Sequence, residues 1–365
     1  MIIGIDCDKL LDSHHSGTHF YLLSIIDALI KVDSRNTYLL LFSQNPPSTL
    51  KSRLALNQKC HIKVIPKVLS WTHFSLPMFC VLNSLDVLFC PWHTAPLFIP
   101  VKTKVVVLIH GLEHKKSKEF WVSNAIKRSD HIVTVSQFNQ SRISTRYHIT
   151  NSKITVIYEG LNVNNIEVPA TPSIETLAKL NNTQDFLFFI SSFVPRKNIP
   201  NMLEAFAKLI HSGDTYASYK FVLAGEIPET QTNYYKDILE QTGLVTNVIY
   251  LGPISSADAA YLFSHCRAFI FVSHEEGFGL PVLEAFHFKV PVVTSTGGAL
   301  PEVSGGAALY ANPDDPKDIY EKMRLVLEDA HLRLSLIKKG ESRVKDFSWI
   351  SAATELLEVF KDVYA

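Results

Sequence analysis

Two glutamates stand eight positions apart in the segment EEGFGLPVLEAF, residues 275–286. Between Glu276 and Glu284 lie two glycines and Pro281. Proline suits the first position of a helix, because the N–H that it lacks would have no partner there. Glycine allows the backbone to approach a ligand closely. The spacing therefore predicts a glycine loop that opens a helix at Pro281, with one carboxylate before the helix and one in its first turn.

The start of such a helix is suited to binding phosphate. The backbone amides of Phe278, Gly279 and Leu280 are expected to point outward there, at a helix end that carries roughly half a positive charge. Glycine and proline also punctuate ordinary loops, and a glutamate in a first turn interacts favourably with the helix dipole in any case. Taken alone, the loop is compatible with a structural role as well as with a phosphate site.

The two carboxylates narrow the choice of ligand. Neither is expected to bind phosphate, because like charges repel, but each can accept hydrogen bonds from a pair of vicinal hydroxyls. A ligand with a diphosphate in its middle and a diol at each end, namely a nucleotide sugar, satisfies all of these groups. In this interpretation Glu284 holds the ribose and Glu276 holds the sugar that is transferred.

A pair of cations supports the same interpretation. Arg196 and Lys197 follow the apolar run FLFFIS and precede the helical pattern IPNMLEAF. They therefore lie in a predicted strand-to-helix loop, where they could neutralise a diphosphate leaving group. A solvated basic turn is the alternative, but the glycine loop with its two acids is expected at the same edge of the same domain.

Short β-rich runs alternate with amphipathic stretches along the whole chain, which predicts parallel sheets covered by helices. The 365 residues suit two domains. We expect an N-terminal domain at 1–165, a C-terminal domain at 166–347 and a last helix at about 348–365 that packs back on the first domain. The polar stretch 160–184 is a candidate linker. In open parallel sheets, ligands bind at the carboxyl ends of the strands.

Several longer segments resemble one enzyme family. They are VPRKNIPNMLEAF, FVLAGE, NVIYLGPISSADAAYLFSHCRAFIFVSHEEGFGLPVLEAF, PVVTSTGGALPEVSGGAALYANPDDP and the terminal FSW, with weaker echoes in the first half such as VVVLIHGLEH. Over nearly its whole length the chain resembles a retaining glycosyltransferase of family 4. The resemblance implies the α/β GT-B fold, in which two Rossmann-like, doubly wound domains face each other across a cleft.

The resemblance also implies roles for individual residues. Arg196 and Lys197 match the family's phosphate-binding cations, and Glu276 and Glu284 match the carboxylates on the donor sugar and the ribose. In the first domain, Gly17 lies in a loop that approaches the donor phosphate and the acceptor in such enzymes. His110, at the end of the run VVVLIH, resembles a histidine beside the reacting sugar.

The chain departs from the family pattern at a few positions. Gly111 stands where many members have an acid, Ser191 and Ser192 where many have a glycine nearby, and Lys289 where glycine is common. The serines weaken the expectation of close phosphate contact at that loop.

Other chemistries are less well supported. Asp6 and Asp8 have the Asp-x-Asp spacing of metal-dependent glycosyltransferases, but the rest of the chain resembles the metal-independent class, so we expect neither a metal nor another cofactor. A hydrolase would use two carboxylates but has no use for a phosphate site with two cations. No GxGxxG follows the first strand, which argues against a dehydrogenase. A catalytically inactive nucleotide-sugar sensor remains an alternative.

Composition limits the partners and the compartment. Lys+Arg and Asp+Glu both number 35, so no overall charge indicates a nucleic-acid partner. Residues 101–153 hold ten basic residues against three acids, which fits a solvated face or, with Phe120 and Trp121, a surface for an anionic membrane. The five scattered cysteines favour a reducing compartment. No signal peptide is recognisable, so we expect a cytoplasmic protein, at the inner face of the cell membrane if the membrane is contacted.

The expected reaction is transfer of a hexosyl group, with retention, to a glycan or lipid-linked glycan acceptor. Similarity to polysaccharide mannosyltransferases makes GDP-mannose the first choice of donor and a UDP-hexose the second. Another acceptor, such as a sugar phosphate, is the alternative within the enzymes.

Overall fold

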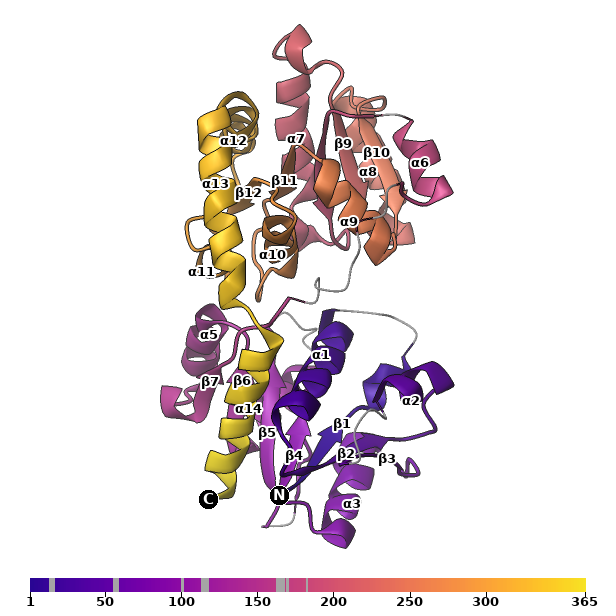
Figure 1. The fold of residues 1–365 in the computed structure, drawn as a ribbon, viewed down its shortest axis with the longest axis vertical. Coiled ribbons are helices and arrows are strands. Elements are labelled where there is room, and N and C mark those ends of the chain that lie inside the picture. Colours follow the sequence, from indigo (N-terminus) through magenta and orange to yellow (C-terminus); the bar gives the residue numbers. More distant parts are fainter. Residues whose placement is uncertain are drawn as a thin grey trace. The chain divides into compact units, whose positions relative to one another are not determined.

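The computed structural model describes residues 1–12, 17–54, 59–99, 102–112, 118–161, 168, 171–181 and 183–365. The chain forms two compact units (Figure 1). Unit 1 comprises Met1–Gly160 together with Phe347–Ala365, and unit 2 comprises Leu161–Asp346. The domain boundary predicted between residues 165 and 166 lies outside the described residues.

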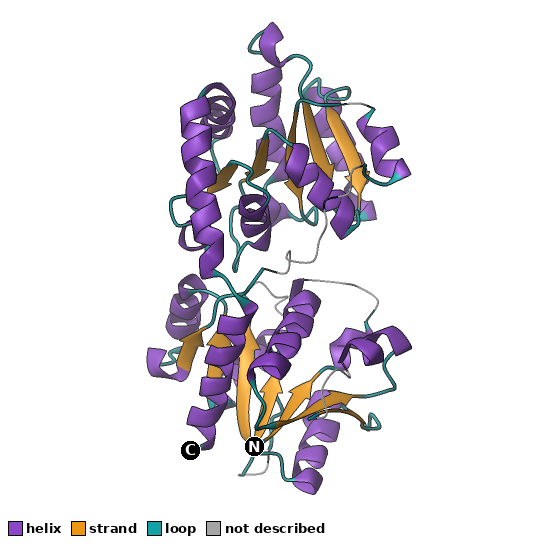
Figure 2. Cartoon of the chain, viewed as in Figure 1, coloured by secondary structure: helices purple, strands orange, loops and turns teal. Residues whose placement is uncertain are grey.

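Unit 1 is built on a parallel sheet with the strand order β3-β2-β1-β4-β5-β6-β7. Its central strands are apolar along almost their whole length, as expected where helices cover both faces, and Figure 2 shows helices on either side. The strands are β1 (Ile2–Asp6), β2 (Thr37–Phe42), β3 (Cys60–Val64), β4 (Val87–Cys90), β5 (Lys104–Ile109), β6 (His131–Thr134) and β7 (Ile154–Val156).

The helices of unit 1 include one from the far end of the chain. They are α1 (Gly17–Val32), α2 (Ser48–Leu54), α3 (Leu76–Asn83), α4 (Glu119–Arg128), α5 (Gln137–Tyr147) and α14 (Trp349–Tyr364), with the short turns η1 (Asp8–Leu11), η2 (Trp71–Ser75) and η4 (Asn151–Lys153). The expected N-cap of α5 is confirmed, because the Ser136 side chain accepts a hydrogen bond from the backbone N–H of Asn139.

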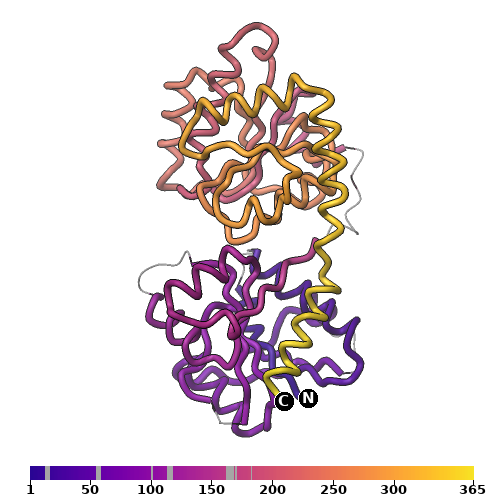
Figure 3. Tube along the Cα trace, turned by 90° about the vertical axis from the view of Figure 1, so that its left-hand side faces the viewer, coloured from indigo at the N-terminus to yellow at the C-terminus, as the bar shows by residue number. Residues whose placement is uncertain are grey.

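The C-terminal helix α14 packs along α1, so the C-terminus lies beside the N-terminus (Figures 1 and 3). The rings of Trp349 and Tyr21 meet edge to face with their centroids 5.3 Å apart, and Phe360 contacts Phe89 of β4 in the same way. A Cβ on Gly160 would lie 2.2 Å from the backbone nitrogen of Trp349. Glycine is therefore required where the last residue of the first segment passes the start of α14.

Unit 2 repeats the doubly wound plan with the strand order β10-β9-β8-β11-β12-β13. Its strands are β8 (Phe186–Ile190), β9 (Lys220–Ala224), β10 (Val248–Gly252), β11 (Ala268–Phe271), β12 (Val292–Ser295) and β13 (Leu309–Ala311). The chain runs outward from β8 to β10 and then returns to place β11 against β8. The strand order therefore reverses between β8 and β11, and ligands bind at such reversals in open α/β sheets.

The helices of unit 2 cover both faces of this sheet (Figure 2). They are α6 (Ile174–Leu180), α7 (Ile199–Ile210), α8 (Thr232–Gln241), α9 (Ser256–His265), α10 (Leu280–His287), α11 (Leu300–Ser304), α12 (Pro316–Glu328) and α13 (Ala330–Arg343), with the turns η6 (Pro195–Lys197), η7 (Asp214–Tyr216), η8 (Glu229–Gln231) and η9 (Val344–Asp346). Fully buried phenylalanines of β8 and β11, Phe188 and Phe269 among them, pack against each other in the core.

The candidate linker 160–184 was wrong in part, because its residues 174–180 form the helix α6. The Ser173 side chain caps this helix by accepting from the N–H of Thr176. Asp258 at the start of α9 in turn accepts hydrogen bonds from the backbone and the hydroxyl of Ser173, at 2.7 and 2.9 Å. The helix depends on this contact with a residue 85 positions away, which the local sequence does not reveal.

Candidate active site

The loops that follow β8, β11 and β12 meet where the strand order of unit 2 reverses. Arg196 and Lys197 lie in η6, directly after β8, and Glu276 lies in the loop between β11 and α10. Arg196 Nη1 donates to Glu276 Oε2 at 2.7 Å, and Lys197 Nζ donates to Glu276 Oε1 at 2.6 Å. The sequence predicted these residues separately, and the structure joins them into one ion-pair network.

Burial differs sharply within this network. The side chains of Lys197 and Glu276 are each 7% exposed, whereas that of Arg196 is 37% exposed. The Lys197 ammonium also lies 4.9 Å from the ring centre of Phe271. The network carries two positive charges against one negative charge, so a surplus of positive charge remains at the carboxyl ends of the strands.

Hydrogen bonds to backbone carbonyls, from one backbone N–H and two side chains, hold the two charged loops together. The N–H of His274 donates to the carbonyl of Arg196 at 2.8 Å, and Arg196 Nη1 reaches the carbonyl of Glu275 at 3.2 Å. Asn198, in a left-handed conformation with φ 58°, donates to the carbonyls of Val272 and Pro313. These contacts set the position of the cations relative to Glu276 before any ligand binds.

Two glycines after β12 help to hold the loop that carries Glu276. Neither was predicted from the sequence as a site residue. Gly298 has φ 65°, and a Cβ there would lie 2.3 Å from the carbonyl oxygen of Glu276. A Cβ on Gly297 would lie 2.1 Å from the carbonyl oxygen of His274. The N–H of Ala299 donates to the carbonyl of Glu276 at 2.9 Å. The sequence signal was the glycine pair in TSTGGAL, which follows the β-rich run PVVTS.

The predicted phosphate site lies at the start of α10. Gly279 is the N-cap of this helix, with φ 109°, and Leu280 is its first residue, so the amides there have no acceptor within the helix. Phe278 is buried. Pro281 is the second residue of the helix, whereas the sequence had predicted it to be the first. Glycine at the N-cap allows the sharp entry that brings the loop from Glu276 into the helix.

Glu284 does not lie in the first turn of α10, where the sequence placed it, because the helix begins at Leu280. Its side chain is partly buried, and no described residue donates a hydrogen bond to its carboxylate or forms an ion pair with it. Burial raises the pKa of Glu284 from 4.5 to about 7. A carboxyl group in such surroundings is suited to accept hydrogen bonds from a ligand, because these would restore the interactions that burial removed.

The raised pKa of Glu284 predicts a specific effect of Glu284→Gln. Between pH 4.5 and about 7 the folded protein keeps a proton that the unfolded chain has lost, so the wild-type free energy of unfolding falls as the pH rises through this interval. Glutamine stays neutral, so the variant should gain stability relative to wild type, on the order of 2 kcal/mol at pH 8. Chemical denaturation at pH 5 and pH 8 measures this gain. An identical pH dependence in both proteins would contradict it.

The remaining predicted site residues, Gly17 and His110, belong to unit 1. Gly17 begins α1, and a Cβ there would meet nothing within 4 Å; the rest of its loop, 13–16, lies outside the described residues. His110 follows β5, and its Nδ1 lies 3.4 Å from Glu159 Oε1. Glu159 was not selected from the sequence, because 49 residues separate it from its partner.

The backbone conformation at Lys289 explains why glycine is common at this position in the family that the chain resembles. Lys289 follows α10 with φ 60°, a left-handed conformation that glycine adopts more easily than any other residue. Its ammonium pairs with Glu341 of α13 at 2.9 Å. The exposed ion pair offsets part of the conformational cost, which is about 1 kcal/mol for a residue other than glycine.

The Asp6-x-Asp8 spacing has a structural role in unit 1. Asp6 Oδ1 accepts from the indole N–H of Trp71 and from the backbone N–H of Asp8. Asp8 Oδ1 accepts from the N–H of Ser43, just beyond β2. Burial raises the pKa of Asp6 to about 6, despite these hydrogen bonds. Across the described ranges, no cluster of three or more His, Cys, Asp or Glu side chains is arranged to hold a metal ion.

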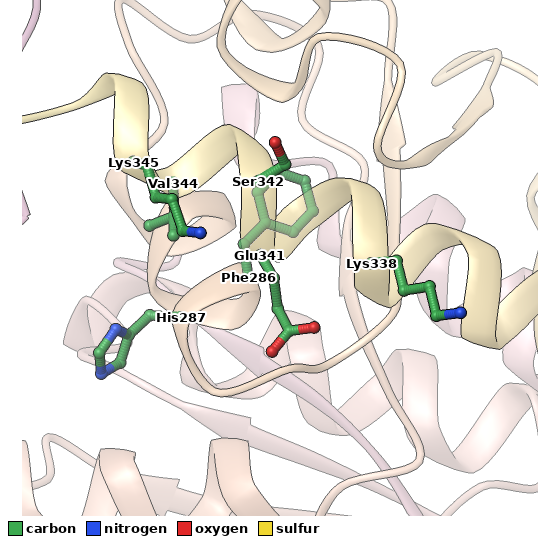
Figure 4. A pocket seen from close by; sticks show the side chains of 7 residues that line it. All are labelled: Phe286, His287, Lys338, Glu341, Ser342, Val344 and Lys345. Atoms are coloured by element: carbon green, nitrogen blue, oxygen red, sulfur yellow. The ribbon is translucent and has the colours of Figure 1, made fainter.

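A surface cavity of about 400 Å³ elsewhere in unit 2 shares no residue with the ion-pair network (Figure 4). It lies between α10 and the end of α13, and its lining residues are Phe286, His287, Lys338, Glu341, Ser342, Val344 and Lys345. Lys338 and Lys345 lie at opposite ends of the lining in this view, and Glu341 is paired with Lys289. The cavity therefore lacks the convergent cations that an anion site would need.

The family model described as "Glycosyl transferases group 1" matches residues 174–343, and that described as "Glycosyltransferase Family 4" matches residues 66–165. O-antigen chain mannosyltransferase B of Escherichia coli is 32% identical over 240 residues, 63% of this chain and 60% of the relative. O-antigen chain mannosyltransferase RfbU of Salmonella typhimurium is 26% identical over 54% of this chain and 51% of the relative. Each match thus spans less than two thirds of the relative.

Solved structures share the fold at low sequence identity. A glycosyltransferase from Rickettsia africae has a TM-score of 0.76 at 16% identity, over 99% of this chain and 98% of that one. HepE of Anabaena, solved with UDP and glucose, has the same TM-score and identity over 99% of this chain and 100% of its own. These likenesses and the two doubly wound units confirm the predicted α/β fold class. The chain is similar to glycosyltransferases of family 4 over both matched segments, and it has the GT-B fold.

Proposed function

We propose that this protein transfers a hexosyl group, with retention, from a nucleotide sugar to a glycan or lipid-linked glycan during polysaccharide synthesis. The observation that carries the proposal is the Arg196–Glu276–Lys197 network, which lies where the strand order of unit 2 reverses. The named relatives act as O-antigen mannosyltransferases, which favours GDP-mannose as the donor. The structure of HepE with UDP-glucose supports a UDP-hexose as the second choice.

The network suggests how the leaving group is stabilised. As the bond between sugar and diphosphate breaks, negative charge grows on the diphosphate, and Arg196, Lys197 and the N-terminus of α10 are positioned to offset it without a metal. Each oxygen of Glu276 already accepts from one cation but keeps a further lone pair for a sugar hydroxyl. Glu284 accepts from the ribose. His110 hydrogen-bonds the transferred sugar, and Gly17 lets the backbone approach the donor phosphate. Attack by the acceptor on the leaving-group side would retain the configuration.

A thermal-shift screen is the first test. Nucleoside diphosphates and their sugars are added one by one, and the ligand that binds raises the melting temperature by mass action. We expect GDP and GDP-mannose to give the largest shifts. A shift with UDP and its hexoses alone would move the donor to the second choice. No shift with any nucleotide would contradict a nucleotide-sugar site.

A donor-hydrolysis assay then separates an enzyme from an inactive sensor. Slow release of nucleoside diphosphate in the absence of acceptor supports an enzyme, and binding without release supports a sensor. Addition of a chelator should leave the rate unchanged if no metal is required. NMR of the glycosidic product tests retention, because the anomeric configuration of donor and product can be compared directly.

An exposed apolar stripe on unit 1 supports contact with an anionic membrane. Four side chains along η2 and α3 face solvent with exposed fractions between 42% and 71%: Phe74, Met78, Val81 and Leu82. The rings of Trp121 in α4 and His73 in η2 are stacked with their centroids 4.4 Å apart. This contact joins the basic stretch 101–153 to the apolar stripe. None of the helices in the described ranges combines the length and hydropathy needed to span a bilayer. We place the protein at the inner face of the cell membrane, where a lipid-linked acceptor would be presented.

Sedimentation with vesicles checks this contact. The wild type should sediment with vesicles of anionic lipid at low salt and remain in solution with neutral vesicles, because basic residues add attraction to the apolar insertion. The double variant Val81→Glu, Leu82→Glu should lose this binding. Leu334→Glu, at an equally exposed apolar residue of unit 2, is the matched control. Wild-type protein that stays in solution with anionic vesicles at low salt would remove the membrane from the proposal.

A further inference from the structure

The ring of His110 is held by contacts on several sides. The backbone N–H of His110 donates to His93 Nε2 at 3.1 Å, and the backbone carbonyl of His110 accepts from Asn139 Nδ2 at 2.8 Å. The ring of Tyr21 packs against it nearly at right angles, with the centroids 4.8 Å apart. Glu159 Oε1 lies 3.4 Å from His110 Nδ1. The position of the imidazole is therefore set by residues of α1 and α5 and of the segments after β4 and β7.

The two ring nitrogens have different surroundings. The side chain of Glu159 is 8% exposed and that of His110 is 13% exposed, so the contact at Nδ1 is largely shielded from water. Nε2 is buried and has no hydrogen-bond partner among the described residues. A buried polar atom without a partner is rare in folded proteins and needs an explanation, of which a bound ligand is one.

The carboxylate favours one of the two positions of the ring proton. An ionised carboxylate only accepts hydrogen bonds, so its contact with Nδ1 favours the tautomer in which Nδ1 is protonated. In a neutral imidazole the other nitrogen then has a lone pair and is an acceptor. Nε2 is thereby prepared to accept a hydrogen bond from a hydroxyl group, and a sugar presents several.

We propose that Glu159 is a positioning residue for His110, which keeps Nδ1 protonated so that Nε2 accepts a hydrogen bond from a hydroxyl of the bound sugar. The inference rests on the proposed function for the identity of the ligand. Glu159 touches the histidine and not the substrate, so its effect on the reaction passes through the tautomer and orientation of the ring. Partners that orient metal-ligating histidines change activity by about 10- to 100-fold when they are removed, and we expect an effect of similar size here.

The test reads the tautomer directly, in protein without donor. Nitrogen-15 NMR of histidine-labelled protein distinguishes a protonated from an unprotonated ring nitrogen, and the His110 signals are assigned by their loss in His110→Asn. We expect protonated Nδ1 and unprotonated Nε2 in the wild type. Glu159→Ala should convert His110 to a mixture of tautomers. Glu159→Gln should lie between the two, because its amide oxygen can still accept from Nδ1.

Asp33→Asn is the matched control. Asp33 is an equally buried acid of unit 1, and it accepts hydrogen bonds from Asn36 and Tyr38. The variant Asp33→Asn should lower the free energy of unfolding without changing the His110 signals. A wild-type signal with Nε2 protonated, or a His110 spectrum that is unchanged in Glu159→Ala, would overturn the inference.

Kinetics provide the second readout. We expect kcat to fall in the order wild type, Glu159→Gln, Glu159→Ala, by about 10- to 100-fold in the last, while KM for the donor changes little. A wild-type kcat in Glu159→Ala would also overturn the inference. If the wild type turns over no nucleotide sugar, the proposed function has failed, and the NMR result still decides whether Glu159 sets the tautomer.

Discussion

Lys197→Ala is expected to lower the turnover of glycosyl transfer by about 10²–10³-fold, the loss typical of removing one group that stabilises charge in a transition state. Lys197 is expected to stabilise the diphosphate as it leaves, and it is the more buried of the two cations. A buried charge acts with less screening by water. Steady-state kinetics with the donor found in the thermal-shift screen measure the loss, and a variant with wild-type turnover would contradict the assignment of the site.

Because the Glu276–Lys197 ion pair is buried, the free energy of unfolding of each variant must be measured beside its turnover. Removing one partner of a buried ion pair leaves the other charge without compensation and costs about 3–5 kcal/mol. Glu276→Ala should therefore both reduce turnover and destabilise unit 2, since it leaves Lys197 without its carboxylate. The double variant Glu276→Gln, Lys197→Met should recover much of the stability and none of the activity. Arg196→Ala, at a more exposed cation, should cost less stability than Lys197→Ala.

Gly298→Ala is expected to disturb the site through the backbone alone. The new Cβ would lie 2.3 Å from the carbonyl oxygen of Glu276 and 2.5 Å from its nitrogen, which is far inside the normal contact distance. Because φ is 65°, alanine is strained there even before the clash. The loop that carries Glu276 must shift. We expect a loss of about 3 kcal/mol in stability and a much weaker affinity for the nucleotide sugar.

Gly306→Ala separates the clash from the strain. Gly306 also has a left-handed backbone, with φ 79°, but a Cβ there would meet nothing within 4 Å. Its replacement should cost about 1 kcal/mol and leave donor affinity unchanged. Thermal unfolding and calorimetric titration of both variants make the comparison. Equal effects of the two substitutions on affinity would show that contact with Glu276 is not what Gly298 provides.

The sequence predicted the features that depend on local pattern. The apolar runs of β4, β5, β8 and β11 are confirmed as strands buried on both faces, and Ser136 is confirmed as a cap. The edge strand β3, with the pattern CHIKV, was not predicted. Its apolar and polar residues alternate, as is typical of a half-buried edge strand, whereas the predicted strands were selected as continuous apolar runs.

Contacts between distant segments could not be predicted. The pairing of Glu276 with Arg196 and Lys197 joins residues about 80 positions apart, so the sequence could suggest three functional residues but not that they bind each other. Glu284 was placed one position too early in the helix, since the proline of α10 is its second residue and not its first. The functions of Gly298 and Glu159 arise from neighbours that only the folded chain brings near.

Because α14 packs along α1, the order of synthesis determines when unit 1 can complete its fold. Unit 2 is one continuous segment and has all of its residues once Asp346 has left the ribosome. The first 160 residues of unit 1 are made earlier, and they lack the helix that covers Phe89 and Tyr21 until α14 has been synthesised. During that interval their apolar face is open to chaperones, and a message truncated before codon 347 would yield a nascent protein that never closes it.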